Sequence, residues 1–428
     1  MKRLSFKSLF QSEIVRNSSV LLSGNVLGQA IALLIYPILT RIYSGADFAL
    51  FSTFTSVCAL LTIFGTGRYE ESLVIAKNKK ETSDLLGFSL KWLFFFSLVL
   101  FIVLALFRKS VFSLFKMEAI RDFWYYIPLT VFISGLLFLL SNLAVRKKKF
   151  KIQAYSNVVK NSVNSLSRLA LGLFSFTGIG LVFSNVIALI AAVFPYSSLK
   201  KFSISALRGK WVDEKKAAWQ YKDFPIFNLG RNFLSSFSTN LPFLYLISIF
   251  EDKLGLFSLS FLVLNTPISL FTNSLFSTFF ENISTYEREK KSILPTLKTY
   301  WKSIFLYILP LFVVAFFIAK PLFSFIFGAI WEESGIYFRY LLPWMFLMLA
   351  TAPLYSVFIV FKKQNKTLWV EVIYLLLRWL ALYTGVHFMN FQLGILLFSM
   401  TGTLIMIVFL IWIYTIIRKY ETQITAIS

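Results

Sequence analysis

Residues 227–250 read FNLGRNFLSSFSTNLPFLYLISIF, an apolar run with Arg231 near its start. A helix needs about 20 largely apolar residues to cross the hydrocarbon core of a bilayer, and this run is long enough. A charged side chain inside such a span is costly and usually faces a protein interior or a water-filled cavity. The run therefore predicts a membrane helix and favours a functional role for Arg231. Because Arg231 lies near one helix end, snorkelling to the membrane surface is the alternative.

The composition extends this interpretation to the whole chain. Of its 428 residues, 57% are hydrophobic and 15% are charged, and the mean hydropathy is +0.72, whereas soluble domains carry about a quarter charged residues. We therefore predict an all-α integral membrane protein. Cys58 is the only cysteine and His387 the only histidine, so we expect no internal disulfide, no metal site and no cofactor. The sequence indicates a protein that is not an enzyme.

The hydropathy pattern predicts about 12 transmembrane helices. The fifth is the least apolar, but omitting it would place the later basic loops on the opposite side of the membrane. The predicted spans are 18–40, 48–67, 85–107, 124–145, 156–176, 179–198, 224–250, 254–276, 301–320, 336–361, 367–388 and 392–417.

The net charge of +23 could indicate nucleic-acid binding, but its distribution argues against that function. Most Lys and Arg residues fall in alternate loops between the spans, which is the pattern that orients membrane proteins with basic loops inside. Both termini are then cytosolic, and the basic segment 1–19 is a retained lead-in, not a cleaved signal. The chain has no Gly-rich phosphate loop, so we do not expect it to hydrolyse ATP by itself.

The spans divide into two groups of six. We expect an N-terminal lobe over 1–198, a basic cytosolic linker over 199–223 and a C-terminal lobe over 224–428. Both lobes open with a polar-tinged helix that contains a proline, Pro37 or Pro242. Paired halves with a site between them are the common organisation of secondary transporters.

Ionisable residues within the spans are the candidates for substrate binding. An excess of positive charge suits an anionic substrate, and the arginine fork suits phosphate, since it donates two parallel hydrogen bonds. Lys91 lies near a span end, where snorkelling is the favoured alternative. The set comprises Lys91, Lys160, Arg168, Arg231, Arg378 and one acid, Glu371.

Span 156–176 concentrates these polar groups. Asn157, Lys160, Asn164 and Arg168 recur at helical spacing, so they either pack on a polar partner or line a wet cavity, and we favour the cavity. Asn25 and Gln29 in the first span are candidates for binding sugar hydroxyls, with helix packing as the alternative.

In span 367–388, Glu371 and Arg378 lie two helical turns apart and share a face. Glu371 could carry a coupling proton or cation, or it could neutralise Arg378. We favour neutralisation.

Several motifs resemble those of a known family. LTRIYSGADFALFSTFTS (39–56), GTGRYEESLVIAKNKKE (65–81) and FGAIWEESGIYFRYLLPWMF (327–346) resemble segments of Wzx-type O-antigen flippases. These polysaccharide biosynthesis proteins belong to the multidrug/oligosaccharidyl-lipid/polysaccharide exporter superfamily.

The resemblance implies two six-helix lobes around a central cationic cavity in the bacterial inner membrane. It implies that alternating access moves an undecaprenyl-pyrophosphate-linked glycan, an O-antigen or capsule repeat unit, to the outer leaflet. Membrane lipids, and the polymerase and chain-length regulator of the pathway, are the implied partners, and nucleic acid is not. The resemblance also implies gate, hinge or anchoring roles for residues at the span ends, namely Arg41, Tyr43, Asp47, Arg68 and Glu70.

Three other functions stay open at this point. A drug/cation antiporter of the same superfamily would carry carboxylates in the N-terminal lobe. A polysaccharide polymerase would carry a large outer loop. A peptidoglycan-precursor flippase is closer but typically has 14 helices (about two more than predicted here).

Overall fold

The computed structural model describes residues 28–31, 33–361 and 363–425, and within these ranges the chain is helical without strands. Residues 28–31 and 33–42 form the first described helix. The remaining helices are α3 (Gly45–Thr66), α4 (Tyr69–Ile75), α5 (Lys79–Leu114), η1 (Glu118–Phe123), α6 (Tyr126–Arg146), α7 (Phe150–Leu173), α8 (Gly178–Val193), η2 (Phe194–Leu199), α9 (Lys200–Leu207), α10 (Trp211–Gln220), η3 (Phe224–Asn228), α11 (Leu229–Tyr245), α12 (Glu251–Arg288), α13 (Leu294–Ser303), η4 (Ile304–Ile308), α14 (Leu309–Phe327), η5 (Ala329–Trp331), α15 (Ser334–Thr351), η6 (Ala352–Tyr355), α16 (Ser356–Val360), α17 (Gln364–His387) and α18 (Phe391–Thr425).

The predicted spans correspond to these helices one by one, apart from the part of the first span that lies outside the described residues. Nine helical segments in the described part are long and apolar enough to cross a membrane. The segments α7 and α11 are not among them, because they carry the polar residues that the sequence analysis singled out. The prediction of an all-α, multi-pass membrane protein is confirmed.

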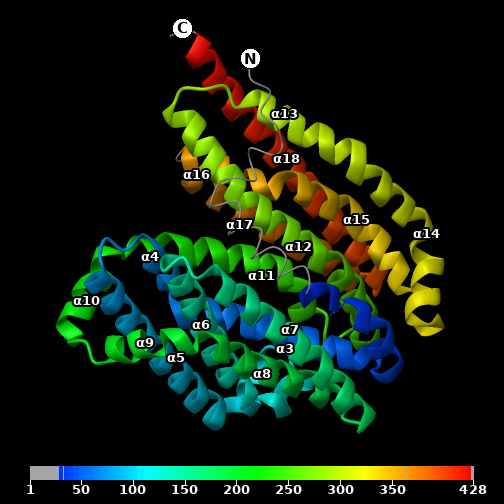
Figure 1. The fold of residues 1–428 in the computed structure, drawn as a ribbon. Helices are drawn as coiled ribbons and strands as arrows, with labels where there is room; N and C mark the ends of the chain where they lie inside the picture. The colour runs from blue at the N-terminus through cyan, green and yellow to red at the C-terminus, as the bar shows by residue number, and fades with distance from the viewer. Residues whose placement is uncertain (1–27, 32, 362, 426–428) are drawn as a thin grey trace. The chain divides into compact units, whose positions relative to one another are not determined.

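The chain forms two compact units, Met1–Glu251 and Asp252–Ser428. In the first unit, α3 packs against α6 and α11, and α7 packs against α8 (Figure 1). The division falls at Glu251, so α11 belongs to the first unit. The two six-helix lobes separated by the linker 199–223 stay a prediction.

The basic linker forms two short helices, α9 and α10, which both pack on α5. Leu85 and Leu86 of α5 and Ala206 of α9 belong to one buried apolar cluster that also includes Leu139 of α6. This segment is therefore not an extended loop, since part of it completes the core of the first unit.

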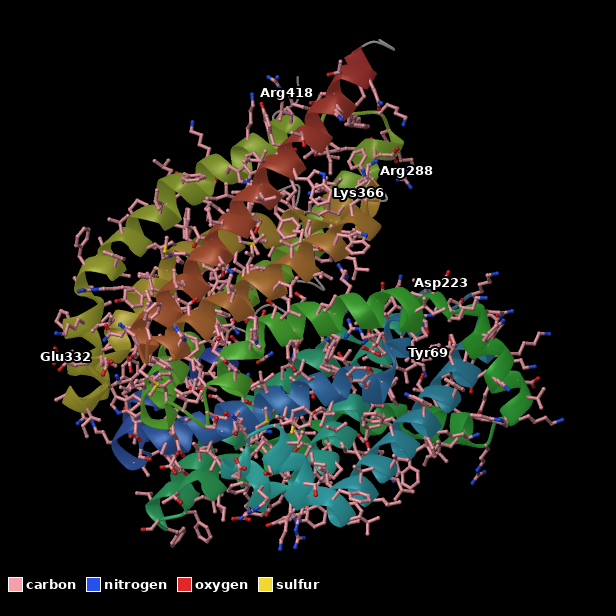
Figure 2. All side chains as sticks on the ribbon, turned by 180° about the vertical axis from the view of Figure 1, so that it is seen from behind. Tyr69, Asp223, Arg288, Glu332, Lys366 and Arg418 are labelled. Atoms are coloured by element: carbon pink, nitrogen blue, oxygen red, sulfur yellow. The ribbon has the colours of Figure 1, made fainter. Side chains whose placement is uncertain are left out.

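The second unit is built from long helices. The pairs α17 and α18, α15 and α18, and α14 and α15 pack side by side (Figure 1). Figure 2 places Arg288, Lys366 and Arg418 toward one end of this unit and Glu332 toward the other. The orientation of the helices in the membrane stays a prediction.

Candidate functional site

Arg231 lies in the first turn of α11, directly after the π-helical segment η3. Such single π-turns often occur at functional sites. The residues from Asn228 to Phe237 are all half-buried, and a Cβ atom added to Gly230 would meet nothing within 4 Å. The start of α11 is thus neither sealed in a core nor fully exposed.

Hydrogen bonds to α3 hold the rest of α11 in place. Thr53 donates its hydroxyl to the carbonyl oxygen of Phe243 at 2.9 Å. Ser56 donates to the side-chain oxygen of Asn240, also at 2.9 Å. Pro242 lies inside α11 and cannot donate a backbone hydrogen bond within the helix. The contacts from α3 therefore support α11 close to the position where its own hydrogen bonding is interrupted.

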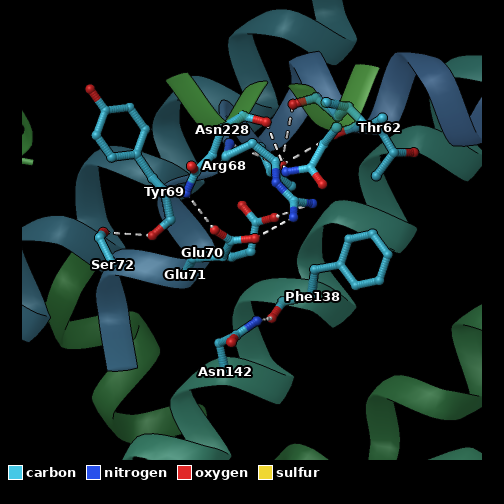
Figure 3. Close-up of polar contacts among 12 residues, drawn as sticks. Thr62, Arg68, Tyr69, Glu70, Glu71, Ser72, Phe138, Asn142 and Asn228 are labelled. Carbon is cyan, nitrogen blue, oxygen red and sulfur yellow. Dashed lines mark hydrogen bonds and ion pairs between the residues drawn. The ribbon is translucent and has the colours of Figure 1, made fainter. Parts of the chain in front are cut away.

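A polar network ties the start of α11 to α4 (Figure 3). Asn228 donates its side-chain amide to Glu71 at 2.9 Å. Arg68 forms a close ion pair with Glu71 and a second pair with Glu70 at 3.2 Å. Gly67 and Arg68 both adopt left-handed backbone angles, and this turn points the arginine at the two carboxylates. The network fixes the helix end three residues before Arg231.

Glu70 is the buried member of this network, with 3% of its surface exposed. Burial raises the pKa of its carboxyl above the ordinary value, and the nearby Arg68 guanidinium opposes that rise. The family motif at Arg68 and Glu70 therefore has an anchoring contact in this structure. A gate or hinge role for these residues stays a prediction.

The other motif, at residues 40–47, also makes structural contacts. Ser44 and Asp47 form a capping box at the start of α3. Tyr43 donates its hydroxyl to the carbonyl oxygen of Arg168 at 2.8 Å. Its ring sits in a slot that is free only because Gly172 and Gly180 lack side chains. Arg41 is exposed.

Arg168 itself is 5% exposed, and its guanidinium lies over the ring of Phe51, 4.4 Å from the ring centre. The Nε atom has no hydrogen-bond partner among the described residues. Arg168 is therefore held between α7 and α3 in this structure and presents little surface to a substrate.

Lys160 lies elsewhere on α7. It lines a cavity of about 280 Å³ whose wall includes Ser141 of α6, Gln153 of α7 and Tyr196 of η2. On the same helix, Asn161 and Asn157 lie against Gly28, whose missing side chain allows the contact. The two explanations offered for the polar stripe thus hold for different side chains: that of Asn161 packs on the first helix, whereas Asn157 and Lys160 border a cavity.

Lys91 makes an ion pair that the sequence did not reveal. Its ammonium donates to both carboxylate oxygens of Glu214, at 2.7 and 2.8 Å, and Glu214 is fully buried. The pair joins α5 to α10 of the basic linker. This contact accounts for a lysine at the end of a span without a substrate.

In the second unit, Arg378 is fully buried. Its guanidinium lies 4.1 Å from the ring centres of Trp344, Tyr374 and Phe398. Glu371 lies two turns away on α17 and is 7% exposed. Arg378 is thus enclosed by aromatic rings from α15, α17 and α18, and a substrate could reach it only if this enclosure opened.

The remaining candidates are neutral. The side-chain oxygens of Gln29 and Asn164 are buried without a hydrogen-bond partner among the described residues. Asn25 lies outside the described residues. No group of His, Cys, Asp or Glu in the described part could hold a metal ion.

Sequence reasoning missed Glu71 and Glu214, which pair with Arg68 and Lys91, and Asn228, which donates to Glu71. For Glu71 a signal was available, because it directly follows Glu70 in the motif at 67–70. Asn228 and Glu214 are distant in sequence from their partners, so no spacing rule could have paired them.

Comparisons with known proteins agree with this architecture. A family model described as "Polysaccharide biosynthesis protein" matches residues 38–335. A search of curated proteins finds no match.

Several solved structures of similar fold are described as transporters or as MATE proteins. One is the crystal structure of a mutant MATE protein, with a TM-score of 0.62 and 13% identity, covering 98% of this chain and 100% of its own. A multidrug resistance MATE family transporter of the MOP superfamily in an inward-facing conformation has a TM-score of 0.60 and 12% identity, covering 93% and 99%. A MOP superfamily transporter from Pyrococcus furiosus, whose description reports reverse polarity of its binding pocket, has a TM-score of 0.61 and 12% identity, covering 98% and 100%.

Proposed function

We propose, from the premise that the chain belongs to the polysaccharide biosynthesis protein family, that it is a flippase for a lipid-linked oligosaccharide. The cargo would be a glycan joined through pyrophosphate to a polyprenyl lipid, such as an O-antigen or capsule repeat unit. The protein would carry it from the inner to the outer leaflet of the bacterial cytoplasmic membrane by alternating access. Both termini would lie in the cytosol, on the side of the basic loops.

The observation that carries this proposal is the position of Arg231. It lies in the first turn of a half-buried amphipathic helix beside open space at Gly230. An arginine fork there can donate two hydrogen bonds to pyrophosphate oxygens. The network of Arg68, Glu71 and Asn228 holds the helix end, so the guanidinium is presented from a fixed backbone.

The other intramembrane cations contribute differently in this proposal. Arg168 and Arg378 are almost fully buried against aromatic rings, and Lys91 is paired with Glu214. These contacts favour roles in holding the helices together. In this conformation, Arg231 is the arginine among the candidates best placed to meet an anionic cargo.

The lipid part of the cargo needs no polar site. A polyprenyl chain is apolar and would remain in the bilayer while the pyrophosphate and sugars cross the protein. Separating the two parts in this way keeps charged groups out of the hydrocarbon, where they are costly.

Substitution of Arg231 tests this function. In bacteria that depend on this protein for surface glycan, Arg231→Ala should lower surface glycan at least about ten-fold, because a charge-assisted hydrogen bond contributes about 1.5–3 kcal/mol. Lipid-linked precursor should accumulate in the inner leaflet at the same time. Arg231→Lys should retain part of the activity, because the charge is kept and the fork is lost.

Arg288→Ala is the matched control, since Arg288 is an exposed arginine at the end of α12. It should leave surface glycan unchanged. Normal surface glycan in cells carrying Arg231→Ala at normal protein level would refute the proposed role of Arg231. A second experiment deletes the gene and then restores the unsubstituted protein. If the distribution of lipid-linked precursor between the two leaflets did not change in either step, the flippase function itself would be wrong.

A further inference from the structure

The cavity beside Lys160 lies inside the first unit, between α6, α7 and the segment from α8 to η2. Its volume is about 280 Å³, and its polar wall groups are Ser134, Ser141, Gln153, Ser156, Asn157, Lys160 and Tyr196. Among the described residues that line it, none carries a carboxylate. An ammonium group with hydroxyls and amides around it, and no acid, is the composition of an anion site.

Lys160 has no ion-pair partner among the described residues. Every ion pair found in that part of the chain joins other residues, and Lys160 is absent from all of them. An ammonium group drawn into a protein interior is stable in its charged form only when a counter-charge or strong acceptors accompany it. Glu214 supplies this compensation to Lys91, but no acid of the described residues forms an equivalent pair with Lys160.

The neutral groups of the cavity are linked to one another. Gln153 donates its amide to the hydroxyl oxygen of Ser141 at 2.6 Å, and Ser156 donates its hydroxyl to the carbonyl oxygen of Ala192. The hydroxyl of Tyr196 is hydrogen-bonded to Ser141 and Ser156. These contacts hold the wall in place, so the ammonium of Lys160 is the donor that would meet a ligand.

The cavity also lies close to a strongly basic turn. Ser141 is near the end of α6 and Gln153 is near the start of α7, and Lys147, Lys148 and Lys149 join these two helices. Burial lowers the pKa of Lys147, and the positive charges of Lys149 and Lys79 lower it further. This end of the unit is therefore electropositive and would concentrate small anions near the cavity.

We propose that this cavity binds a small inorganic anion, of the size of chloride or phosphate, as the counter-ion of Lys160. The volume accommodates such an ion with accompanying water. The site differs from the cargo contact at Arg231 and does not depend on the identity of the cargo. Its physical role is to keep Lys160 charged and to link α6, α7 and η2 through one shared ligand.

Thermal unfolding of the full-length protein in detergent tests this site. Chloride and phosphate are titrated separately as sodium salts, with sodium gluconate as the reference salt that holds the ionic strength constant. A ligand that binds only the folded protein raises the melting temperature in a saturable way. We expect this response with at least one of the two anions.

Lys160→Gln should abolish the response or shift it to at least about ten-fold higher anion concentration. Lys151→Gln is the matched control, because Lys151 is exposed on the same helix, and it should respond like the unsubstituted protein. Should Lys160→Gln fail to fold, Tyr196→Phe removes the hydroxyl that is hydrogen-bonded to Ser141 and Ser156 in the lining and should weaken the response.

Two results would overturn the proposal. One is an unsubstituted protein whose melting temperature does not respond saturably to either anion. The other is an anion response that survives intact in both Lys160→Gln and Tyr196→Phe. Either result leaves the proposed function at Arg231 unaffected, so the two proposals can fail separately.

Discussion

Lys91 on α5 and Glu214 on α10 form an ion pair in which the ammonium contacts both carboxylate oxygens, at 2.7 and 2.8 Å. The pair crosses from a membrane span to the basic linker, 123 residues further along the chain. The aromatic rings of Phe88 and Trp211 stack nearby between the same two helices. This pair and this stacking contact add to the buried apolar cluster and to a more exposed ion pair between Lys80 and Asp213 at 3.6 Å, and together they fasten the linker to α5.

Lys91→Ala should therefore destabilise the protein. It leaves the fully buried Glu214 carboxylate without its cation, and an unsatisfied buried polar group costs about 1–3 kcal/mol, or more when it is charged. Lys91 is about one-third exposed, 33%, so solvent offsets part of this effect. The melting temperature of the purified protein measures the loss.

The double variant Lys91→Met with Glu214→Gln should recover much of that stability, since no buried charge remains. An Ala variant as stable as the unsubstituted protein would show that the pair does not hold the linker.

Arg378→Ala should destabilise the second unit by about 2–5 kcal/mol, because it empties a packed site and removes contacts to three rings. Trp344→Ala should have a similar effect, and the double variant should lose less than the sum. Thermal unfolding of the unsubstituted protein, the two single variants and the double variant gives the coupling free energy between Arg378 and Trp344. If the Arg378→Ala variant had the melting temperature of the unsubstituted protein but produced no surface glycan, Arg378 would contact the cargo instead.

Glu70 should make stability depend on pH. Its folded-state pKa is raised above the ordinary value by burial, so the folded state favours the protonated carboxyl. The free energy of unfolding should be highest below the unfolded pKa and fall as the pH rises through the folded pKa. Glu70→Gln should remove this fall.

Glu118→Gln is the control for this experiment, because Glu118 is an exposed carboxyl in the same unit and should leave the pH profile unchanged. A profile that is identical in the unsubstituted protein and the Glu70→Gln variant would contradict the assignment.

Gly385→Ala should weaken the contact between α17 and α18. A Cβ atom at this position would lie 2.5 Å from the Cα atom of Gly394, so the two backbones would have to separate. Overpacking of this kind costs about 1–3 kcal/mol, which a lower melting temperature would register.

Gly230→Ala provides the comparison, since an added Cβ there meets nothing within 4 Å. It should be neutral or slightly stabilising, because alanine favours a helix over glycine by about 1 kcal/mol. Equal effects of the two substitutions would contradict the close approach of α17 and α18.

Much of the helix pattern followed from local sequence alone. The predicted span 124–145 corresponds to α6 over Tyr126–Arg146, and 48–67 corresponds to α3 over Gly45–Thr66. These spans could be predicted because hydropathy depends only on consecutive residues and a bilayer requires a minimum apolar length. The polar character of α7 and α11 was visible for the same reason.

The surroundings of each charge could not be predicted in this way. Arg168 and Lys160 share one helix, yet the first stacks on Phe51 and the second borders a cavity. Eight residues correspond to about 2.2 turns of an α-helix. The two side chains therefore point in different directions and meet different neighbours. Which neighbours those are depends on the packing of α3, α6 and α8 around α7.

By itself, the sequence determined that the chain crosses a membrane many times as helices and that a few cations lie within the spans. Only the tertiary structure decided the surroundings of each cation: Lys91 pairs with the buried Glu214, Arg168 and Arg378 lie against aromatic rings, and Arg231 lies on a half-buried helix end. The reason is physical. Hydrophobicity is a property of a segment, whereas the environment of a charge is set by helices that are distant in sequence and adjacent in space.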